Sequence, residues 1–190
     1  MRALQTKRLC LTPVTVRNAQ ILWKILQAPN LRRFQDLPTV GIGTFIAMVG
    51  KRPKRLDPQA TGRFEWLVLI NQENSVAGWV SLRLSEREPT IGEIGYSLLA
   101  EFRGRGIAAE AVRELVNEAF REAKLRAVRA YCVPENTDSR RLLERVGFEP
   151  DGVMPHGASV RGEPVDVLSY AIQRRGWNQS GKTIEIPASV

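Results

Sequence analysis

Apolar residues in the middle of the chain follow two different spacings, which predict a strand and a helix joined by a tight turn. Residues 91–99 form a strand-like run with one apolar face and one face of small and polar residues. Residues 108–123 repeat an apolar residue every three or four positions, the spacing of one helix face. Between them, Gly104 and Gly106 let the backbone turn tightly where the helix begins, so that its free N–H groups can converge on an anion.

The same two patterns predict the remaining elements. Further strands are expected over residues 6–13, 64–70, 76–84, 126–133 and 165–172, and another begins at Phe148. Helices are expected from about Thr15 to residue 26, as one or two short pieces within 31–49, and over 137–146. This order predicts an α/β fold of the α+β kind. Its mixed, mostly antiparallel sheet has about six or seven strands, is flanked by helices and contains one parallel crossover around the long helix.

Length and composition fit one domain. The 190 residues are 43% hydrophobic, enough for one core, so we predict a single domain over residues 1–178 and a flexible tail over 179–190. No run approaches the roughly 18 apolar residues of a membrane span, so we expect a cytoplasmic protein without membrane contact. Cys10, Cys132 and the single histidine, His156, show no metal-ligand spacing; we expect no metal, and two reduced, buried cysteines.

The net charge of +8 is concentrated in the first third of the chain. Residues 1–63 hold 12 Lys and Arg against two acidic residues, whereas residues 64–190 hold 16 against 18. A mobile basic loop is expected over residues 51–63. This asymmetry indicates either a surface for acidic partners, such as nucleic acid, a ribosome or an anionic substrate, or a charge bias that only aids solubility.

Two familiar phosphate-binding motifs do not fit the glycine turn. Gly104-x-Gly106-x-x-Ala109 can be written as a dinucleotide fingerprint, but it lies mid-chain, and the next strand ends at residues 131–133 without a carboxylate for the ribose. A P-loop is excluded because Ile107-Ala108 replaces its Lys-Ser/Thr pair. The turn therefore predicts a phosphate site of another family.

Two motifs resemble those of the GCN5-related N-acetyltransferases (GNAT). Arg103-x-x-Gly106-x-Ala108 is similar to the Arg/Gln-x-x-Gly-x-Gly/Ala signature with which that family binds the pyrophosphate of acetyl-CoA. Asn136-x-x-Ser139-x-x-Leu142, followed by Gly147-Phe148, resembles the family's helix after the fifth strand, where the Asn contacts the pantetheine arm. Residues 93–96 (Glu-Ile-Gly-Tyr), residues 6–9 and Trp177 resemble the RimJ/RimL branch, which acetylates protein N-termini.

The resemblance spans roughly residues 6–177 and implies a GNAT-like fold, acetyl-CoA as co-substrate and no metal. It implies direct attack of a primary amine, on a protein N-terminus or a small amino compound, in a ternary complex. The residues expected at the cofactor are Leu98, Leu99, Arg103, Gly104, Arg105, Gly106, Ile107, Ala108, Asn136 and Ser139. A backbone N–H near Leu98 or Leu99 would meet the negative charge that develops on the thioester oxygen.

The resemblance also implies two candidate catalytic residues. Glu93 would act as the base, directly or through water; the alternative is a structural Glu paired with an Arg, and Glu65 and Glu163 are weaker candidates. Many family members use a Tyr as the acid in the helix after the fifth strand, but here no Tyr lies between Asn136 and Phe148. Ser139 could hydrogen-bond the sulfur there, or could orient the cofactor or cap the helix.

A second function remains open, an RNA- or ribosome-binding module that uses the basic first third, with a vestigial or regulatory acyl-CoA site. It predicts salt-dependent RNA binding through Lys51, Arg52, Lys54 and Arg55. The loop has no aromatic residues to stack on bases, which counts against nucleic acid as the main target. A third possibility is that the basic region selects an acidic or ribosome-associated acceptor. The acceptor and the oligomeric state, monomer or homodimer, stay open.

Overall fold

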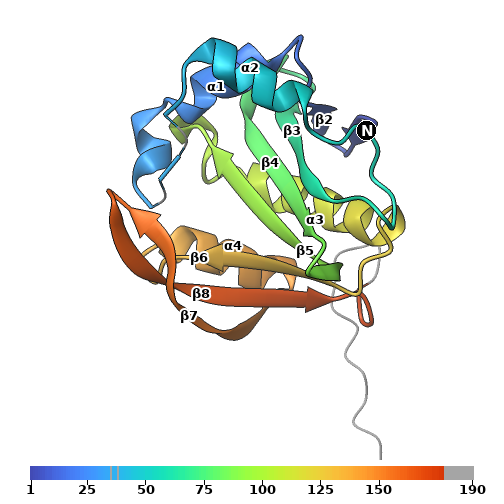
Figure 1. Cartoon of the computed structure of the whole chain (residues 1–190), viewed down its shortest axis with the longest axis vertical. Coiled ribbons are helices and arrows are strands. Elements are labelled where there is room, and N and C mark those ends of the chain that lie inside the picture. Colours follow the sequence, from blue (N-terminus) through green and yellow to red (C-terminus); the bar gives the residue numbers. More distant parts are fainter. Residues whose placement is uncertain (35, 38, 178–190) are drawn as a thin grey trace, which may run out of the picture.

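An eight-stranded sheet runs through the part of the chain that the computed structural model describes, residues 1–34, 36–37 and 39–177 (Figure 1). The strands are β1 (Leu4–Gln5), β2 (Leu9–Pro13), β3 (Gly62–Ile70), β4 (Ser75–Ser85), β5 (Glu88–Leu98), β6 (Ala127–Cys132), β7 (Glu149–Val160) and β8 (Glu163–Gln173). The helices are α1 (Ala19–Leu26), α2 (Ile42–Gly50), α3 (Ile107–Arg121) and α4 (Thr137–Val146), with 3-10 turns η1 (Pro29–Arg32) and η2 (Ala100–Phe102). The sheet order is β1-β2-β3-β4-β5-β6-β8-β7, and all neighbours are antiparallel except β5 and β6.

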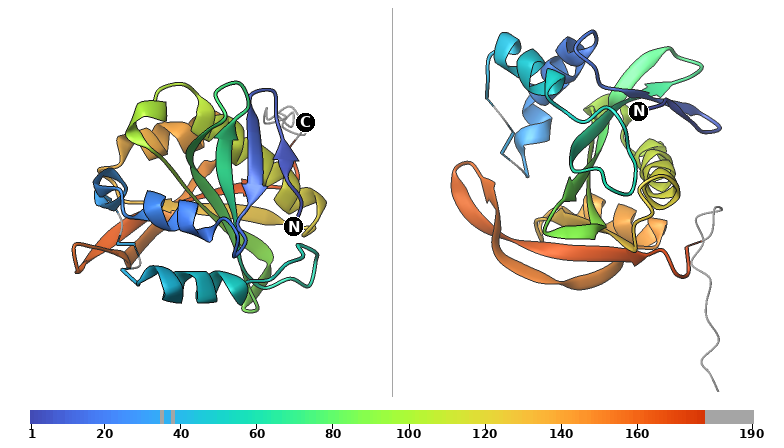
Figure 2. Two further views of the ribbon diagram at one scale, coloured as in Figure 1. Left: turned by 90° about the horizontal axis from the view of Figure 1, so that it is seen from above. Right: turned by 45° about the vertical axis from the view of Figure 1, so that its right-hand side comes forward.

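The helices cover the two faces of the sheet in pairs (Figure 2). On one face, α3 and α4 bury residues such as Leu115 against Trp66 and Ile94. On the other face, α1 and α2 pack over Leu67 and Trp79. Because successive strand residues point to opposite faces, each central strand supplies both cores, and a change of register would disturb both.

The predicted fold class and its single parallel crossover, β5–α3–β6, are confirmed. The described part of the chain has one strand beyond the expected number because Leu4–Gln5 forms a short edge strand paired with β2. Of the one or two short helices expected within residues 31–49, the described residues form one α-helix, α2, and Gly43 lies inside it. The predicted tail, residues 179–190, lies outside the described residues.

Two local predictions need correction. Helix α1 begins at Ala19 rather than at about Thr15, because the Asn18 Oδ1 accepts the Thr15 N–H at 2.7 Å and holds a turn there. Cys10 is half-buried rather than buried, since its strand lies near the sheet edge, whereas Cys132 is buried as expected. The single histidine, His156, lies within β7, with a φ of 52° at an irregularity of the strand pairing.

Asp36, in the connection between η1 and α2, is tied to the tip of the β7–β8 hairpin. Its carboxylate accepts the Ser159 hydroxyl at 2.6 Å and the N–H groups of Arg161 and Gly162 at 2.9 and 3.0 Å. The hydroxyl and the two backbone donors lower the pKa of Asp36. This link joins segments more than 120 residues apart and borders the face that α1 and α2 cover.

No helix within the described ranges combines the length and apolar character needed to cross a membrane. In the same residues, no group of three or more His, Cys, Asp or Glu side chains gathers as a metal site.

Glu65 is a buried carboxylate of β3, only 3% exposed, on the face covered by α1 and α2. It pairs with Arg52, just after α2, and lies 3.5 Å from the Arg63 guanidinium. The Arg52 guanidinium stacks 5.5 Å from the Phe45 ring centre, and burial together with repulsion from Arg63 lowers the pKa of Arg52 to about 10. The expected basic loop over 51–63 therefore turns one of its cations inward.

Glu65→Ala is expected to lower the free energy of unfolding by about 3 kcal/mol, because it leaves Arg52 buried without a carboxylate. Urea unfolding followed by circular dichroism measures the change. The double variant Arg52→Met/Glu65→Leu removes both charges and is expected to lose less. A loss below about 1 kcal/mol in the single variant would contradict a buried pair.

Candidate active site

The two central strands β5 and β6 separate halfway along β5 (Figure 1). They pair only where Ile91–Ile94 faces Ala127–Ala130, whereas β5 continues to Leu98 and β6 to Cys132. The last residues of β5 are therefore hydrogen-bonded to β4 alone among the described strands. Backbone donors and acceptors exposed in this way are a template for an extended ligand.

One of the two amides predicted to stabilise the thioester oxygen is already occupied. The Leu99 N–H donates to the Ala77 carbonyl at 2.9 Å. In an antiparallel ladder alternate residues direct their N–H groups to the partner strand, so the Leu98 N–H is directed away from β4, toward β6. Leu98 is therefore the better candidate of the two.

The glycine turn follows β5 and η2 and leads directly into α3. Gly104 and Gly106 have φ angles of 72° and 74°, in the left-handed region where glycine is favoured. Gly106 is the N-cap of α3, and no side chain of the described residues caps the helix. The first N–H groups of a 15-residue helix are thus left for another acceptor, and the helix dipole adds a positive partial charge there.

The two arginines of the turn differ in their partners. Arg105 pairs with Glu73 in the β3–β4 turn, and its guanidinium lies 5.7 Å from the centre of the Phe102 ring. Within the part of the chain that the structure describes, the Arg103 side chain makes only a long hydrogen bond, 3.4 Å, to the Leu98 carbonyl. Arg103 is therefore better placed than Arg105 to contact a phosphate. Arg8, which the sequence did not single out, donates to the Arg105 carbonyl at 3.0 Å.

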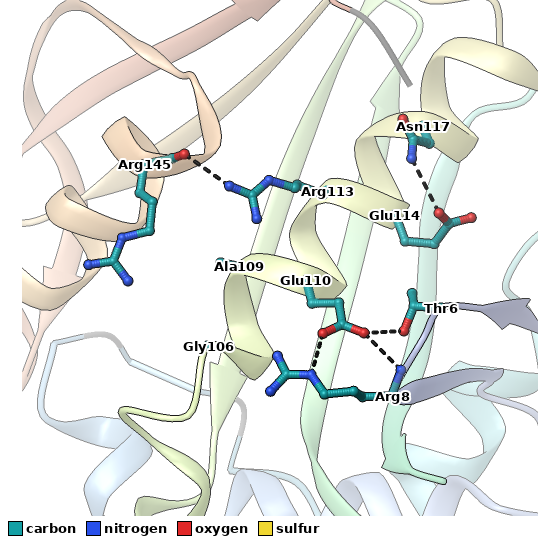
Figure 3. A pocket seen from close by; sticks show the side chains of 9 residues that line it. All are labelled: Thr6, Arg8, Gly106, Ala109, Glu110, Arg113, Glu114, Asn117 and Arg145. Carbon is teal, nitrogen blue, oxygen red and sulfur yellow. Dashed lines mark hydrogen bonds and ion pairs between the residues drawn. The ribbon is translucent and has the colours of Figure 1, made fainter. Parts of the chain in front are cut away.

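A cavity of about 380 Å³ lies beside the turn, along α3 (Figure 3). Its lining carries three arginines and two glutamates: Arg8, Arg113, Arg145, Glu110 and Glu114. The Arg8 Nε donates to Glu110 at 2.6 Å, and Arg113 donates to the Arg145 carbonyl at 3.1 Å. Burial raises the pKa of Glu110, but hydrogen bonds from Thr6 and Arg8 outweigh it and lower that pKa overall. The cavity therefore contains the ion pair between Arg8 and Glu110 and two further arginine side chains, and it lies next to Gly106.

Asn136 and Ser139 lie together at the start of α4, after β6. Asn136 is the N-cap residue, and its Oδ1 accepts the Ser139 N–H at 3.1 Å. Among the described residues the Asn136 Nδ2 group has no hydrogen-bond partner, so it can still donate to a ligand. The capping role expected for this motif falls to Asn136.

Tyr96 is a candidate site residue that was not predicted from the sequence. Its hydroxyl lies 2.7 Å from the Ser139 Oγ and so bridges β5 and α4 across the separated strands. Burial, partly offset by Ser139, raises the pKa of Tyr96, and burial also raises the pKa of the nearby Cys132 thiol. Tyr96 shares a strand face with Ile94, which is the face that α3 and α4 cover, and this periodicity was the available signal.

Glu93 lies on the opposite face of β5, near the point where β5 and β6 separate. Its side chain is 42% exposed and lies 3.8 Å from the Arg83 guanidinium. The weaker candidates differ from it: Glu65 is buried in an ion pair, and Glu163 lies exposed at the start of β8, beside the hairpin tip.

Comparisons with known proteins identify the family of the chain. A family model described as Acetyltransferase (GNAT) domain matches residues 8–149. The chain is 27% identical to the uncharacterized N-acetyltransferase p20 of Bacillus licheniformis over 177 residues, which are 92% of this chain and 98% of that protein. It is 34% identical over 105 residues to the putative ribosomal N-acetyltransferase YdaF of Bacillus subtilis (strain 168), 55% of this chain and 57% of YdaF. Mycobacterium smegmatis RimJ in complex with CoA-disulfide shares the fold, with a TM-score of 0.75 and 20% identity over 92% of this chain and 87% of that chain.

The family match covers the separated strands, the glycine turn and α4. It includes every residue that the sequence analysis assigned to the cofactor. The chain therefore belongs to the GNAT family and is an N-acetyltransferase that uses acetyl-CoA as its acyl donor.

Proposed function

We propose that this protein acetylates the primary amine of a protein N-terminus or a small amino compound by direct attack within a ternary complex. The observation that carries the proposal is the separation of β5 from β6 next to a helix whose N-terminus has no side-chain cap. An extended thioester arm can take the hydrogen bonds that β6 no longer makes to β5. Its phosphates then lie at the start of α3.

The donor would be held from both sides of this gap. The amides of residues 104–108 and the Arg103 guanidinium suit the pyrophosphate, and the Asn136 amide suits the pantetheine arm. The cavity lined by Arg8, Arg113 and Arg145 suits the phosphate-bearing nucleotide end of the donor.

The chemical step follows from these positions. The amine nitrogen attacks the thioester carbon, a C–N bond forms, the C–S bond breaks, and the proton of the amine passes to Glu93. An α-amine has a pKa of about 7.7 to 8.0, so a base is useful at neutral pH. The Leu98 N–H would stabilise the charge on the carbonyl oxygen, and the Ser139 hydroxyl would hydrogen-bond the leaving sulfur, which takes up a solvent proton.

A ribosomal acceptor is supported by the name of one relative, since YdaF is named a putative ribosomal N-acetyltransferase. The RNA-binding alternative loses support because Arg52, one of its four cations, is 15% exposed and paired with Glu65.

Calorimetry with acetyl-CoA, followed by a thiol-release assay over a panel of amines, tests the proposal. Saturable donor binding and amine-dependent thiol release are expected. Absence of donor binding to the folded protein would refute it.

Ser139→Ala is expected to lower kcat/KM for acetyl-CoA by about tenfold, through the loss of one hydrogen bond to the donor. Tyr96→Phe removes the hydrogen-bond partner of the Ser139 hydroxyl and is expected to lower the same kcat/KM by about threefold. Tyr170→Phe is the matched control, because this second buried tyrosine bonds Glu144 instead, at 3.1 Å. Equal effects of all three variants would remove Ser139 and Tyr96 from the donor site.

A further inference from the structure

A row of charged side chains crosses the sheet beside Glu93. The strand register places Arg63 of β3 opposite Arg83 of β4, and Arg83 opposite Glu93 of β5. Cross-strand neighbours share one face of a sheet. Four residues along the same strands, Leu67 and Trp79 pack with α1 and α2, so the row lies on that face.

The charges in this region do not balance. Arg63 lies 3.5 Å from Glu65, but Glu65 is also the partner of Arg52. Among the carboxylates of the described residues, Arg83 reaches only Glu93, at 3.8 Å. Three guanidinium groups therefore share two carboxylates, and Arg63 and Arg83, directly opposite each other, repel.

The excess cations also have free donors. Neither the Arg63 nor the Arg83 guanidinium donates a hydrogen bond to any other described residue, and their side chains are 45% and 61% exposed. Arg129, which continues the row on β6, differs: it bonds Glu88 at 2.8 Å and lies 3.3 Å from Asp151. The unused cationic donors are therefore confined to the β3–β4 side of Glu93.

We propose that Arg63 and Arg83 form a carboxylate-binding subsite of the acceptor site, so that preferred acceptors carry an acidic group close to the primary amine. The inference rests on the proposed function and on Glu93 as the base. An amine within hydrogen-bonding reach of Glu93 brings its neighbouring groups next to Arg83, and planar guanidinium groups bind carboxylates through paired hydrogen bonds. An acidic protein N-terminus and a free acidic amino acid share this chemistry.

Kinetics with matched acceptors at one low ionic strength test the subsite. The peptide arm compares Ser-Asp-Asp and Ser-Asn-Asn N-termini, and the small-molecule arm compares glutamate with glutaminamide, which lacks both carboxylates. In the arm that contains the true acceptor class, wild type is expected to have a kcat/KM about fivefold higher for the acidic acceptor than for its neutral counterpart. Arg63→Gln and Arg83→Gln should each bring that ratio toward one, with little change for the neutral member. Arg87→Gln, in the exposed β4–β5 turn, is the matched control and should keep the ratio.

Failure of the subsite is distinguishable from failure of the function. Thiol release that is equal for acidic and neutral acceptors in both arms keeps the acetyltransferase and overturns the subsite. If no amine releases thiol, the proposed function fails. The subsite is then tested by titrating the two N-acetylated peptides and the N-acetylated forms of glutamate and glutaminamide into wild type and Arg83→Gln. Tighter binding of an acidic member that Arg83→Gln abolishes supports it, and equal binding overturns it.

Discussion

Glu93→Gln is expected to lower kcat by about 100-fold or more and to leave the affinity for acetyl-CoA unchanged. Removal of a positioned base typically costs 10²- to 10⁴-fold, and Glu93 lies on the face of β5 opposite Tyr96 and Ser139, which contact each other on the donor side. The substitution preserves size and removes only the ability to take a proton. Steady-state kinetics with a fixed amine, together with calorimetric titration of acetyl-CoA, separates the two effects.

The pH–rate profile provides the sharper readout for Glu93. The dependence of the rate on pH should differ between wild type and Glu93→Gln, because glutamine cannot take the proton of the amine. Glu88→Gln is the control, since Glu88 lies on the same strand, 54% exposed, and pairs with Arg129. An unchanged profile in Glu93→Gln would leave Glu93 as a structural partner of Arg83.

Gly106→Trp is expected to weaken acetyl-CoA binding by at least about 100-fold, equivalent to roughly 2.7 kcal/mol. A Cβ at this position would lie 3.5 Å from the Arg8 guanidinium, which is ordinary van der Waals contact, so the substitution causes no clash at Cβ. The indole would instead occupy the space in front of the first amides of α3, where phosphate oxygens are expected. Calorimetry measures the loss directly.

Backbone strain at Gly106 needs its own control, because φ is 74° there and a residue with a Cβ costs about 1 to 2 kcal/mol in that region. Gly176 has a φ of 104°, and no atom of the described residues lies within 4 Å of its Cβ position, so Gly176→Trp carries a similar strain outside the donor site. It should bind acetyl-CoA normally. If Gly106→Trp folds and still binds the donor with wild-type affinity, the phosphates bind elsewhere.

The features that could be predicted from the sequence are those with local causes. Glycines one residue apart before an apolar helical repeat predict the positive φ values at Gly104 and Gly106, because few other residues adopt them. Asn136 and Ser139, three residues apart at a helix start, indicate a capped helix, although the cap was expected from Ser139 and the Asn136 side chain makes it. The crossover from β5 to β6 follows from strand and helix periodicity.

The features that could not be predicted depend on contacts between distant segments. The charge of Arg105 is balanced by Glu73, 32 residues away, and no pattern in the sequence around either residue indicates this ion pair. Arg52 lies in a loop with the composition of an exposed basic patch, yet it turns inward because Glu65 is buried on the neighbouring strand. The Tyr96–Ser139 contact joins residues 43 positions apart across two strands that do not pair there.

The separation of β5 and β6 also bears on what the protein gains and loses in each catalytic cycle. Four register pairs join the β1–β5 part of the sheet to the β6–β8–β7 part, and beyond them the pairing between β5 and β6 is missing. Water must satisfy those backbone groups whenever the donor is away. In the proposed binding mode the donor occupies this gap as an additional strand of the sheet, and water returns to the gap when the product leaves. Bound donor should therefore stabilise the folded protein by RT ln(1 + [L]/Kd), so that the melting temperature rises with the concentration of the donor.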